Sequence, residues 1–199
     1  MMEVESTICE QEEETVSEIT TIGLDLAKHT FHVVGCTRHG KAVVRKMLRR
    51  GQVRTYFANL PACVVGMEAC ASAHYWAREL KALGHEVRLI PAQYVKAYLR
   101  GNKNDYNDAR AIAEAASRAD IRAVAVKTVE QQDVQALHRM RAARVGERTA
   151  LCNEVRAVLC ERGIIVAQGV GRLRRRLPEV LEDADNGKRC GLPTFLSLM

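Results

Sequence analysis

The order of its short apolar segments is the feature that most constrains the fold of this chain. Five segments have the β-branched and apolar composition of strands, and they lie at residues 19–26, 30–36, 42–48, 62–67 and 85–90. Three segments with helical character alternate with the later strands, at residues 51–60, 69–83 and 105–119. A turn containing Gly40 favours an antiparallel hairpin between the second and third strands, whereas strands joined through helices are typical of parallel pairing.

The predicted order is therefore β-β-β-α-β-α-β-α, a meander of three strands followed by βαβ units. This order requires an α/β architecture, a mixed sheet with flanking helices, in which the first strand lies beside the fourth. It is the succession of the ribonuclease H-like (RuvC-like) fold. Actin-like kinases share the succession, so the fold by itself does not fix the chemistry.

A segment of different character follows, because residues 130–162 contain no Pro and a single Gly and so predict one long helix. Its apolar residues share a broad face, which must be covered by another helix or by a second copy of the chain. They are Val134, Leu137, Met140, Val145, Leu151, Cys152, Val155, Val158 and Leu159. This face favours a homo-oligomer, a dimer or tetramer, formed through the long helix. Arginines in its middle indicate that this stretch either meets carboxylates or contacts phosphate.

The charge of the chain is divided unevenly. The 30 Lys and Arg exceed the 24 Asp and Glu, for a formal net charge of +6. Residues 1–20 hold seven of the acidic residues and no Lys or Arg, so 17 acidic residues accompany 30 basic ones in the rest. Such an acidic tail is typical of disorder, and such a basic body suits a polyanion, although basic residues also solvate helix faces. We expect a disordered tail at 1–18, an α/β domain at 19–128, the long helix at 129–165 and an Arg-rich exit at 166–199.

Composition also excludes several classes of protein. No run approaches the about 18 apolar residues of a membrane span, and the acidic N-terminus is unlike a signal peptide. We therefore expect no membrane partner and a cytoplasmic location. The seven cysteines include no C-x-x-C pair, which argues against a disulfide framework or a zinc site.

Four acidic residues lie where this topology would bring them together. Asp25 stands within the first strand, and Glu68 directly follows the fourth. Asp105 and Asp108 lie three residues apart at the start of the last helix of the α/β domain. Converged carboxylates repel one another unless a cation neutralises them, and their oxygens suit Mg²⁺ or Mn²⁺, which can support phosphoryl transfer. The sequence therefore predicts a catalytic metal site built from these four residues.

Some of these residues also have a structural interpretation. Asp105 as N-cap, with Asp108 three positions later, fits a capping arrangement that needs no metal. An unpaired carboxylate within an apolar strand, in contrast, is costly, so Asp25 favours the interpretation as a metal site. His29, His32 and His74 could act as general bases, but structural roles are favoured because metal-bound water needs no histidine.

Three motifs follow one another along the chain: GLDLAK at 23–28, MEAC at 67–70 and KNDYNDAR at 103–110. Together they resemble the motifs of the DEDD transposases of bacterial insertion sequences. That family includes pilin-gene invertases and bridge-RNA-guided recombinases. The likeness extends from residue 19 to about residue 186.

This resemblance implies a function and a site. Asp25, Glu68, Asp105 and Asp108 would be the metal-binding tetrad of a RuvC-like catalytic domain, with Mg²⁺ or Mn²⁺ as cofactor. The long helix would be a coiled-coil element that engages a partner subunit and structured RNA. The reaction would be DNA transposition or recombination through strand exchange, with a guide RNA specifying target and donor DNA.

Basic residues beside the acids, on the long helix and at its exit are the candidate nucleic-acid ligands. They are Lys28, Arg100, Lys103, Arg139, Arg141, Arg144, Arg148, Arg156, Arg172, Arg174, Arg175 and Arg176. If they bind phosphates, affinity should fall steeply with salt.

Family members carry a further C-terminal domain with a nucleophilic serine, and this chain ends at Met199 before any such domain. We therefore expect residues 1–199 to bind nucleic acid and metal without completing recombination alone, residues 166–199 including the start of a truncated C-terminal region. The main alternative is a catalytically incomplete module that captures RNA or DNA without chemistry. A sugar or acetate kinase of the actin-like group is disfavoured, because Ala27 and Lys28 stand where its phosphate segment needs glycine.

Overall fold

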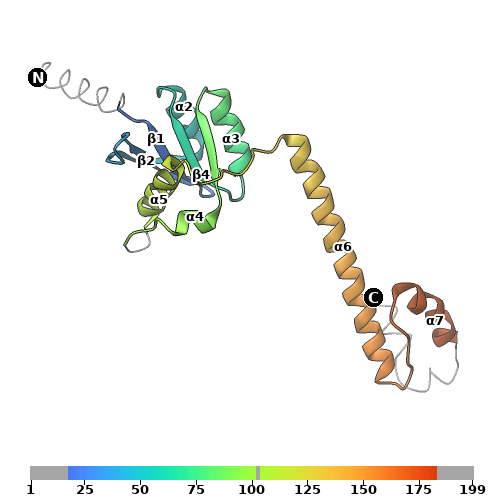
Figure 1. The fold of residues 1–199 in the computed structure, drawn as a ribbon. Helices are drawn as coiled ribbons and strands as arrows, with labels where there is room; N and C mark the ends of the chain where they lie inside the picture. The colour runs from blue at the N-terminus through green and yellow to red at the C-terminus, as the bar shows by residue number, and fades with distance from the viewer. Residues whose placement is uncertain (1–17, 102–103, 183–199) are drawn as a thin grey trace, which may run out of the picture. The chain divides into compact units, whose positions relative to one another are not determined.

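The computed structural model of the chain describes residues 18–101 and 104–182 (Figure 1). Predictions that concern residues 1–17, Lys103 and residues 183–199 lie outside the described residues. The chain divides into two compact units, Met1–Thr128 and Val129–Met199. All five strands and helices α2 to α5 belong to the first unit, and helices α6 and α7 belong to the second.

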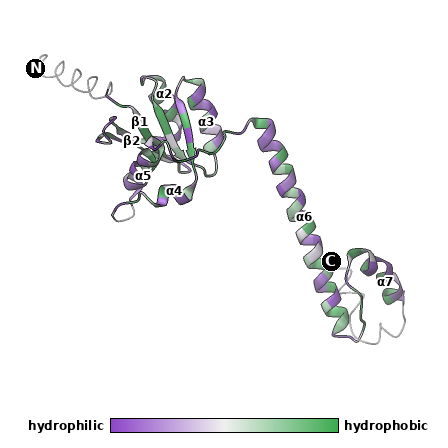
Figure 2. Ribbon diagram, viewed as in Figure 1, coloured by the Kyte–Doolittle hydropathy of each residue, from purple (hydrophilic) through white to green (hydrophobic). Residues whose placement is uncertain are grey.

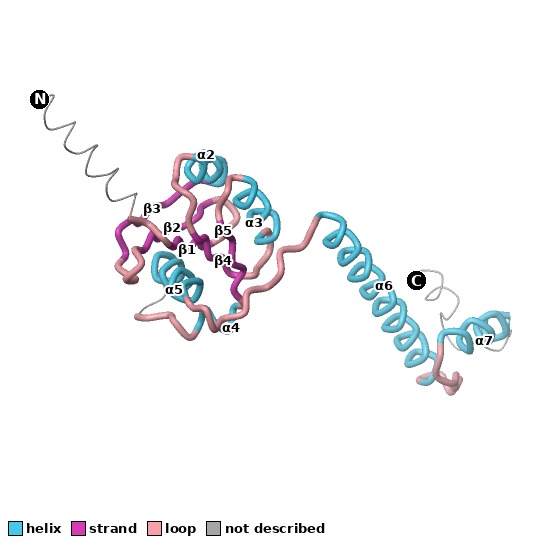
Figure 3. Tube along the Cα trace, turned by 45° about the horizontal axis from the view of Figure 1, so that its top comes forward, coloured by secondary structure: helices cyan, strands magenta, loops and turns pink. Residues whose placement is uncertain are grey.

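A five-stranded mixed sheet forms the centre of the first unit (Figure 3). Its strands are β1 (Thr21–Asp25), β2 (Thr30–Cys36), β3 (Ala42–Arg49), β4 (Val64–Glu68) and β5 (Glu86–Ile90). They lie in the order β3-β2-β1-β4-β5, with β3-β2-β1 antiparallel and β1-β4-β5 parallel. The α/β class, the three-strand meander and the place of the first strand beside the fourth are thereby confirmed.

Helices cover both faces of this sheet. They are the 3₁₀ helix η1 (Arg50–Gln52), α2 (Val53–Ala58), α3 (Ala73–Ala82), α4 (Ala92–Lys96) and α5 (Asp105–Ser117). Side chains alternate between the faces along a strand. Leu24 of β1 packs in one cluster with Phe57 of α2 and Trp76 of α3, while the neighbouring Gly23 and Asp25 face α5 on the other side. Asp25, a candidate metal ligand, therefore lies on the α5 face.

Helix α5 lies very close to the sheet because glycine and alanine meet there. A Cβ atom on Gly23 would lie 1.8 Å from the carbonyl oxygen of Ala109, and one on Gly66 would lie 2.4 Å from the Cβ of Ala116. Both distances are far shorter than van der Waals contact, so only glycine permits this approach. The close packing places the first turn of α5 at the end of β1.

Two local features of the first unit differ from expectation. Helix α4, which follows Pro91 and buries Val95, is not predicted by the sequence pattern. The predicted N-cap of α5 is wrong: Asn104 occupies that position, and its side-chain oxygen accepts a hydrogen bond from the backbone N–H of Tyr106 at 3.0 Å. An N-cap needs an extended backbone, and Asn104 has one, with φ −153° and ψ 134°. The first helical residue, Asp105, is therefore not needed as a cap.

The second unit contains two helices within the described residues, α6 (Val129–Cys160) and α7 (Val170–Glu182). The predicted long helix is confirmed. Helix α7 is not predicted by the sequence pattern, because it carries Pro178 in its interior. Four residues form the core between α6 and α7: Val155, Leu159, Leu173 and Val180.

The apolar face predicted for the long helix is covered only near its C-terminal end. Leu137 and Met140 are 65% and 64% exposed, whereas Leu159 is buried. Figure 2 shows hydrophobic and hydrophilic residues mixed along α6. No helix within the described residues is long and apolar enough to cross a membrane.

Candidate metal centre

Three carboxylates converge at the end of β1. One oxygen from each of Asp25, Asp105 and Asp108 lies within 4.8 Å of the other two. Asp25 is the last residue of β1, and the other two lie in the first turn of α5, three positions apart and hence on one side of the helix. The structure thus brings together three of the four acids singled out in the sequence.

Glu68, the fourth acid, ends β4 beside this group. Strands β1 and β4 run parallel, and the residues that precede the two acids, Leu24 and Met67, lie opposite each other. Glu68 does not belong to the 4.8 Å group, but its charge contributes to raising the pKa of Asp25. It therefore lies at the rim of the same acidic centre.

Burial and neighbouring charges raise the pKa of Asp25 above its ordinary value of 3.8. Desolvation is the largest cause, Asp108 and Asp105 follow, and His32 acts in the opposite direction. Desolvation and the neighbouring carboxylates both penalise the ionised form of Asp25. A cation among these carboxylates would reverse that preference, because it stabilises every ionised group around it.

The donor set fits a hard divalent cation. The three ligand atoms of the group are carboxylate oxygens, the donors that Mg²⁺ and Mn²⁺ favour. Asp25 and Asp108 are half-buried, which limits their motion, and Asp105 is exposed. The arrangement can hold a cation and leave it accessible to a phosphodiester from solvent.

The three candidate histidines have different surroundings. His32 lies opposite Asp25 in the β1–β2 ladder, and its Nε2 is 3.7 Å from Oδ2 of Asp105. His74 accepts a hydrogen bond at Nδ1 from the backbone N–H of Lys127 at 3.2 Å, which fits the structural interpretation. His29 is exposed in the loop after β1. Residue type alone does not distinguish them, because the strand register decides which one meets the acids.

Candidate nucleic-acid ligands occur in both units. Lys28 and Arg100 of the first unit are exposed, and Arg100 lines a small cavity with Tyr98, Asn107 and Arg110. Lys103 lies outside the described residues. Lys28 follows the last residue of β1 by three positions, and Arg100 precedes the first turn of α5 by five. Both are therefore close to the acidic centre along the chain.

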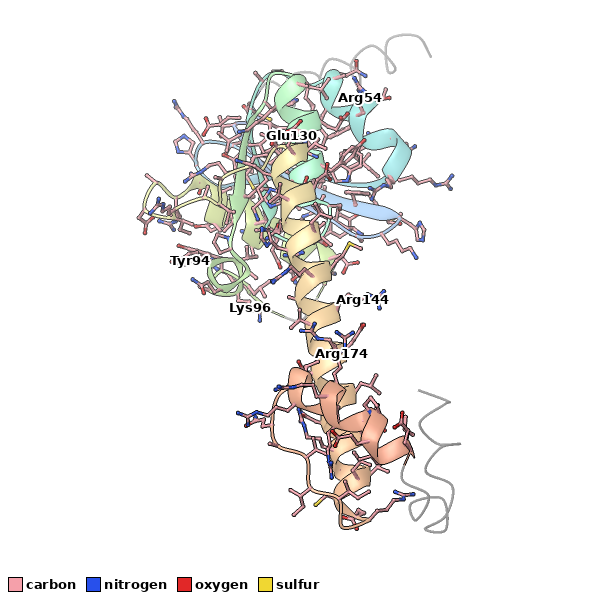
Figure 4. All side chains as sticks on the ribbon, turned by 90° about the vertical axis from the view of Figure 1, so that its right-hand side faces the viewer. Arg54, Tyr94, Lys96, Glu130, Arg144 and Arg174 are labelled. Carbon is pink, nitrogen blue, oxygen red and sulfur yellow. The ribbon has the colours of Figure 1, made fainter. Side chains whose placement is uncertain are left out.

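The remaining candidates lie in the second unit. Arg156 is half-buried, and the others are exposed, namely Arg139, Arg141, Arg144, Arg148, Arg172, Arg174, Arg175 and Arg176. Arg144 forms an ion pair with Glu147 at 2.8 Å, and Arg176 forms one with Glu179. Figure 4 labels Arg144 on α6 and Arg174 on α7. Helices α6 and α7 thus present a set of arginines to solvent.

Sequence reasoning missed the residues that set the distance between α5 and the sheet. Gly23 and Gly66 lie inside buried strands, and Ala109, Ala113 and Ala116 line the helix face that meets them. A glycine within a strand signals the close approach of another backbone, and alanines at spacings of four and three on a helix give the matching signal. Together they could have identified this contact.

The fold and the site define an α/β domain with a carboxylate centre suited to divalent metal chemistry. The sequence pattern of the DEDD transposases of IS110 type, a family described as "Transposase", matches residues 22–162, which include all four acids. The chain belongs to this family of transposases.

Relatives carry the same description. A probable family 20 transposase of Pseudomonas aeruginosa is 57% identical over 150 residues, which are 75% of this chain and 44% of the relative. The transposase for insertion sequence element IS1111A of Coxiella burnetii is 45% identical over 167 residues, 84% of this chain and 46% of the relative. The transposase for element IS1328 of Yersinia enterocolitica is 43% identical over 157 residues, which are 79% of this chain and 47% of the relative. The chain spans less than half the length of these relatives.

Proposed function

We propose that the first unit is the RuvC-like, metal-dependent catalytic domain of a DNA transposase that cleaves and exchanges DNA strands. The observation that carries the proposal is the convergence of Asp25, Asp105 and Asp108 within 4.8 Å, with Glu68 at the rim. Such a group is electrostatically unfavourable without a cation, as the raised pKa of Asp25 indicates. Its oxygen donors fit Mg²⁺ or Mn²⁺.

Each residue of the centre has a part in this proposal. Asp25, Asp105 and Asp108 hold the cation, and Glu68 adds negative charge from the neighbouring strand. A bound Mg²⁺ or Mn²⁺ would polarise the scissile phosphodiester and activate the attacking oxygen. Gly23 keeps the ligands of β1 and α5 together, because it allows α5 to approach the strand. Because cation binding favours the ionised form of Asp25, it also releases a proton from this carboxyl whenever the metal-free chain retains one.

The basic residues are proposed to bind the nucleic acids. Lys28, Arg100 and Lys103 would contact the DNA strand near the acidic centre, since they flank its ligands along the chain. The arginines of α6 and α7 would bind phosphates of a structured guide RNA or of DNA, because most of them are exposed. The exposed apolar residues of α6, Leu137 and Met140 among them, would pair with a second copy of the chain.

The second candidate function is capture of RNA or DNA without chemistry. The exposed arginines of α6 and α7 favour it, because they need no metal in order to bind phosphate. The two functions differ in what the carboxylates do. Under the first function, the carboxylates bind metal and the metal is needed for strand cleavage. Under the second, removal of the carboxylates changes neither metal binding nor strand cleavage.

The test is Mn²⁺ binding by residues 1–199. Binding is measured by isothermal titration calorimetry and by the disappearance of the free-ion electron paramagnetic resonance signal. We expect Asp25→Asn to abolish saturable binding. Asp120→Asn, an exposed acid after α5, is the matched control and should bind as the unmodified chain does. Cleavage of branched DNA by a full-length relative that carries the corresponding substitutions then separates the two functions. Absence of saturable Mn²⁺ binding to the unmodified chain would overturn the proposal.

A further inference from the structure

We infer that His32 is a positioning residue of the metal centre, which orients the carboxylate of Asp105 toward the cation. The inference rests on the proposed metal-binding function and concerns a residue outside the four acids. It is carried by the place of His32 in the sheet, by its distance to Asp105, and by the surroundings of its two ring nitrogens.

The register of the sheet fixes the position of His32. It lies directly opposite Asp25 in the antiparallel β1–β2 pair, so the two side chains lie on the same face of the sheet. That face is the one covered by α5. From there, Nε2 of His32 lies 3.7 Å from Oδ2 of Asp105, within ion-pair distance and slightly beyond hydrogen-bond distance. His32 therefore bridges the strand that carries one acid and the helix that carries the other.

The second ring nitrogen of His32, Nδ1, has unusual surroundings. Nδ1 of His32 is buried and has no hydrogen-bond partner within the part of the chain that the structure describes. A proton on Nδ1 would be a buried donor without an acceptor, which is costly. The favoured neutral tautomer therefore carries its proton on Nε2, the nitrogen that faces Asp105. The surroundings of the ring thus direct its N–H at a carboxylate.

The ring of His32 is packed against its neighbours, whereas the carboxylate of Asp105 is exposed. The side chain of His32 is 12% exposed, and its ring packs edge-on against Tyr106, with centroids 5.0 Å apart and an interplanar angle of 79°. The side chain of Asp105 is 62% exposed, and one of its carboxylate oxygens faces Nε2 of His32. A donor held beside an exposed carboxylate restricts its rotamers, and a hydrogen bond formed when the two atoms come slightly closer would occupy one oxygen and leave the other for the cation. Groups that hydrogen-bond a metal ligand in this way typically contribute 10- to 100-fold to metal affinity.

The experiment compares Mn²⁺ affinity among variants of the full chain. His32→Phe keeps a flat ring against Tyr106 and removes both nitrogens, and we expect it to weaken Mn²⁺ binding by about 10-fold or more. His32→Gln places an amide N–H near the position of Nε2 and should restore affinity to within about 3-fold of the unmodified chain. His29→Phe, the same change at an exposed histidine, is the control and should have no effect. Thermal unfolding without metal checks that each variant is folded.

The outcomes are distinct. Weak binding by His32→Phe together with recovery in His32→Gln supports the inference. Equal affinity of His32→Phe and the unmodified chain overturns it and leaves the metal centre intact. Weak binding by both variants also overturns it, because an N–H donor returned to this position would then not restore Mn²⁺ affinity. Absence of Mn²⁺ binding to the unmodified chain overturns the metal centre itself.

Discussion

Helices α5 and α6 are both regular, and they differ in how much of their surface is packed. In α5, six of 13 residues are buried, and all of them are alanine except Ile112. In α6, two of 32 residues are buried, Val155 and Leu159. The short helix is therefore held along most of its inner face, whereas the long one is held only near its C-terminal end.

The two helices also carry different side chains. The first turn of α5 carries two carboxylates of the acidic centre, and close packing on glycine fixes their distance from Asp25. Helix α6 carries exposed arginines and exposed apolar residues, which are free to meet another molecule. Dense packing would keep the geometry of the proposed metal site, and the unpacked part of α6 is the part proposed to contact nucleic acid or a second copy of the chain. Substitutions in the two helices and at the acidic centre should therefore have unequal effects.

The largest effect should come from removing the close approach of α5. Gly23→Ala places a Cβ atom 1.8 Å from the carbonyl oxygen of Ala109, so α5 must move away from β1. We expect the unfolding free energy of the first unit to fall by about 3 kcal/mol, measured by urea denaturation, and Mn²⁺ binding to be abolished. Gly51→Ala is the control, since a Cβ there meets no atom within 4 Å, and it should change stability little.

A smaller destabilisation is expected at the packed end of α6. Leu159 is fully buried among residues of α6 and α7, so Leu159→Ala should lower the unfolding free energy of the second unit by about 2 kcal/mol. Leu137→Ala makes the same substitution at a residue that is 65% exposed and should change the unfolding free energy by less than about 0.5 kcal/mol. Chemical denaturation of the two variants checks the contrast. Equal destabilisation would show that the exposed part of α6 is packed in solution.

Asp25→Asn should affect stability with opposite signs in the absence and presence of metal. The folded chain raises the pKa of Asp25, so folding favours the protonated form and the stability contribution of this group falls as pH rises through its folded pKa. At neutral pH the amide removes this penalty, and the melting temperature of the metal-free chain should rise. With Mn²⁺ the unmodified chain should gain stability that the variant lacks. Thermal scans in EDTA and in Mn²⁺ measure both; a fall in EDTA would contradict an unfavourable ionised Asp25.

The smallest effects should come from single arginines of α6. Arg141 and Arg148 are both exposed, and replacing either by Gln should make the dependence of log affinity on log salt shallower. The slope should change by about 0.7 to 0.9 for each phosphate that the arginine neutralises. Fluorescence anisotropy with a structured RNA and with duplex DNA gives the slopes. Arg54→Gln, an exposed arginine of the first unit that pairs with Glu79 at 3.4 Å, is the control. An unchanged slope in both α6 variants would remove these residues from the interface.

Much of the fold could be predicted from the sequence because each strand has a local signature. The run at 62–67 is short and apolar and follows Pro61, which indicates a buried parallel strand without any tertiary information, and the run at 85–90 has the pattern of a strand that Pro91 ends. The long helix is equally local, since its segment lacks breakers. Helix α7 could not be predicted in this way because Pro178 normally ends a helix, and its packing on α6 overrides that preference.

Less of the candidate site could be predicted. The four acids stand out by their positions at strand and helix ends, and the same positions allow a capping interpretation of Asp105. Asn104 is the N-cap instead, because the backbone conformation at that residue decides which side chain can reach the N–H of Tyr106. The role inferred for His32 depends on pairing across two strands, which no local pattern reveals.

Local composition and periodicity are enough to set the order of the five strands, the long helix and the identity of the acidic residues, so the amino-acid sequence alone specifies them. Which acids meet, how close α5 lies to β1 and which histidine faces the group are properties of the folded chain. They depend on contacts between residues distant in the sequence, set by strand register and by the room that Gly23 and Gly66 leave for a helix. Distances of a few ångströms between carboxylates result from this packing, and no single segment of the chain contains the information that fixes them.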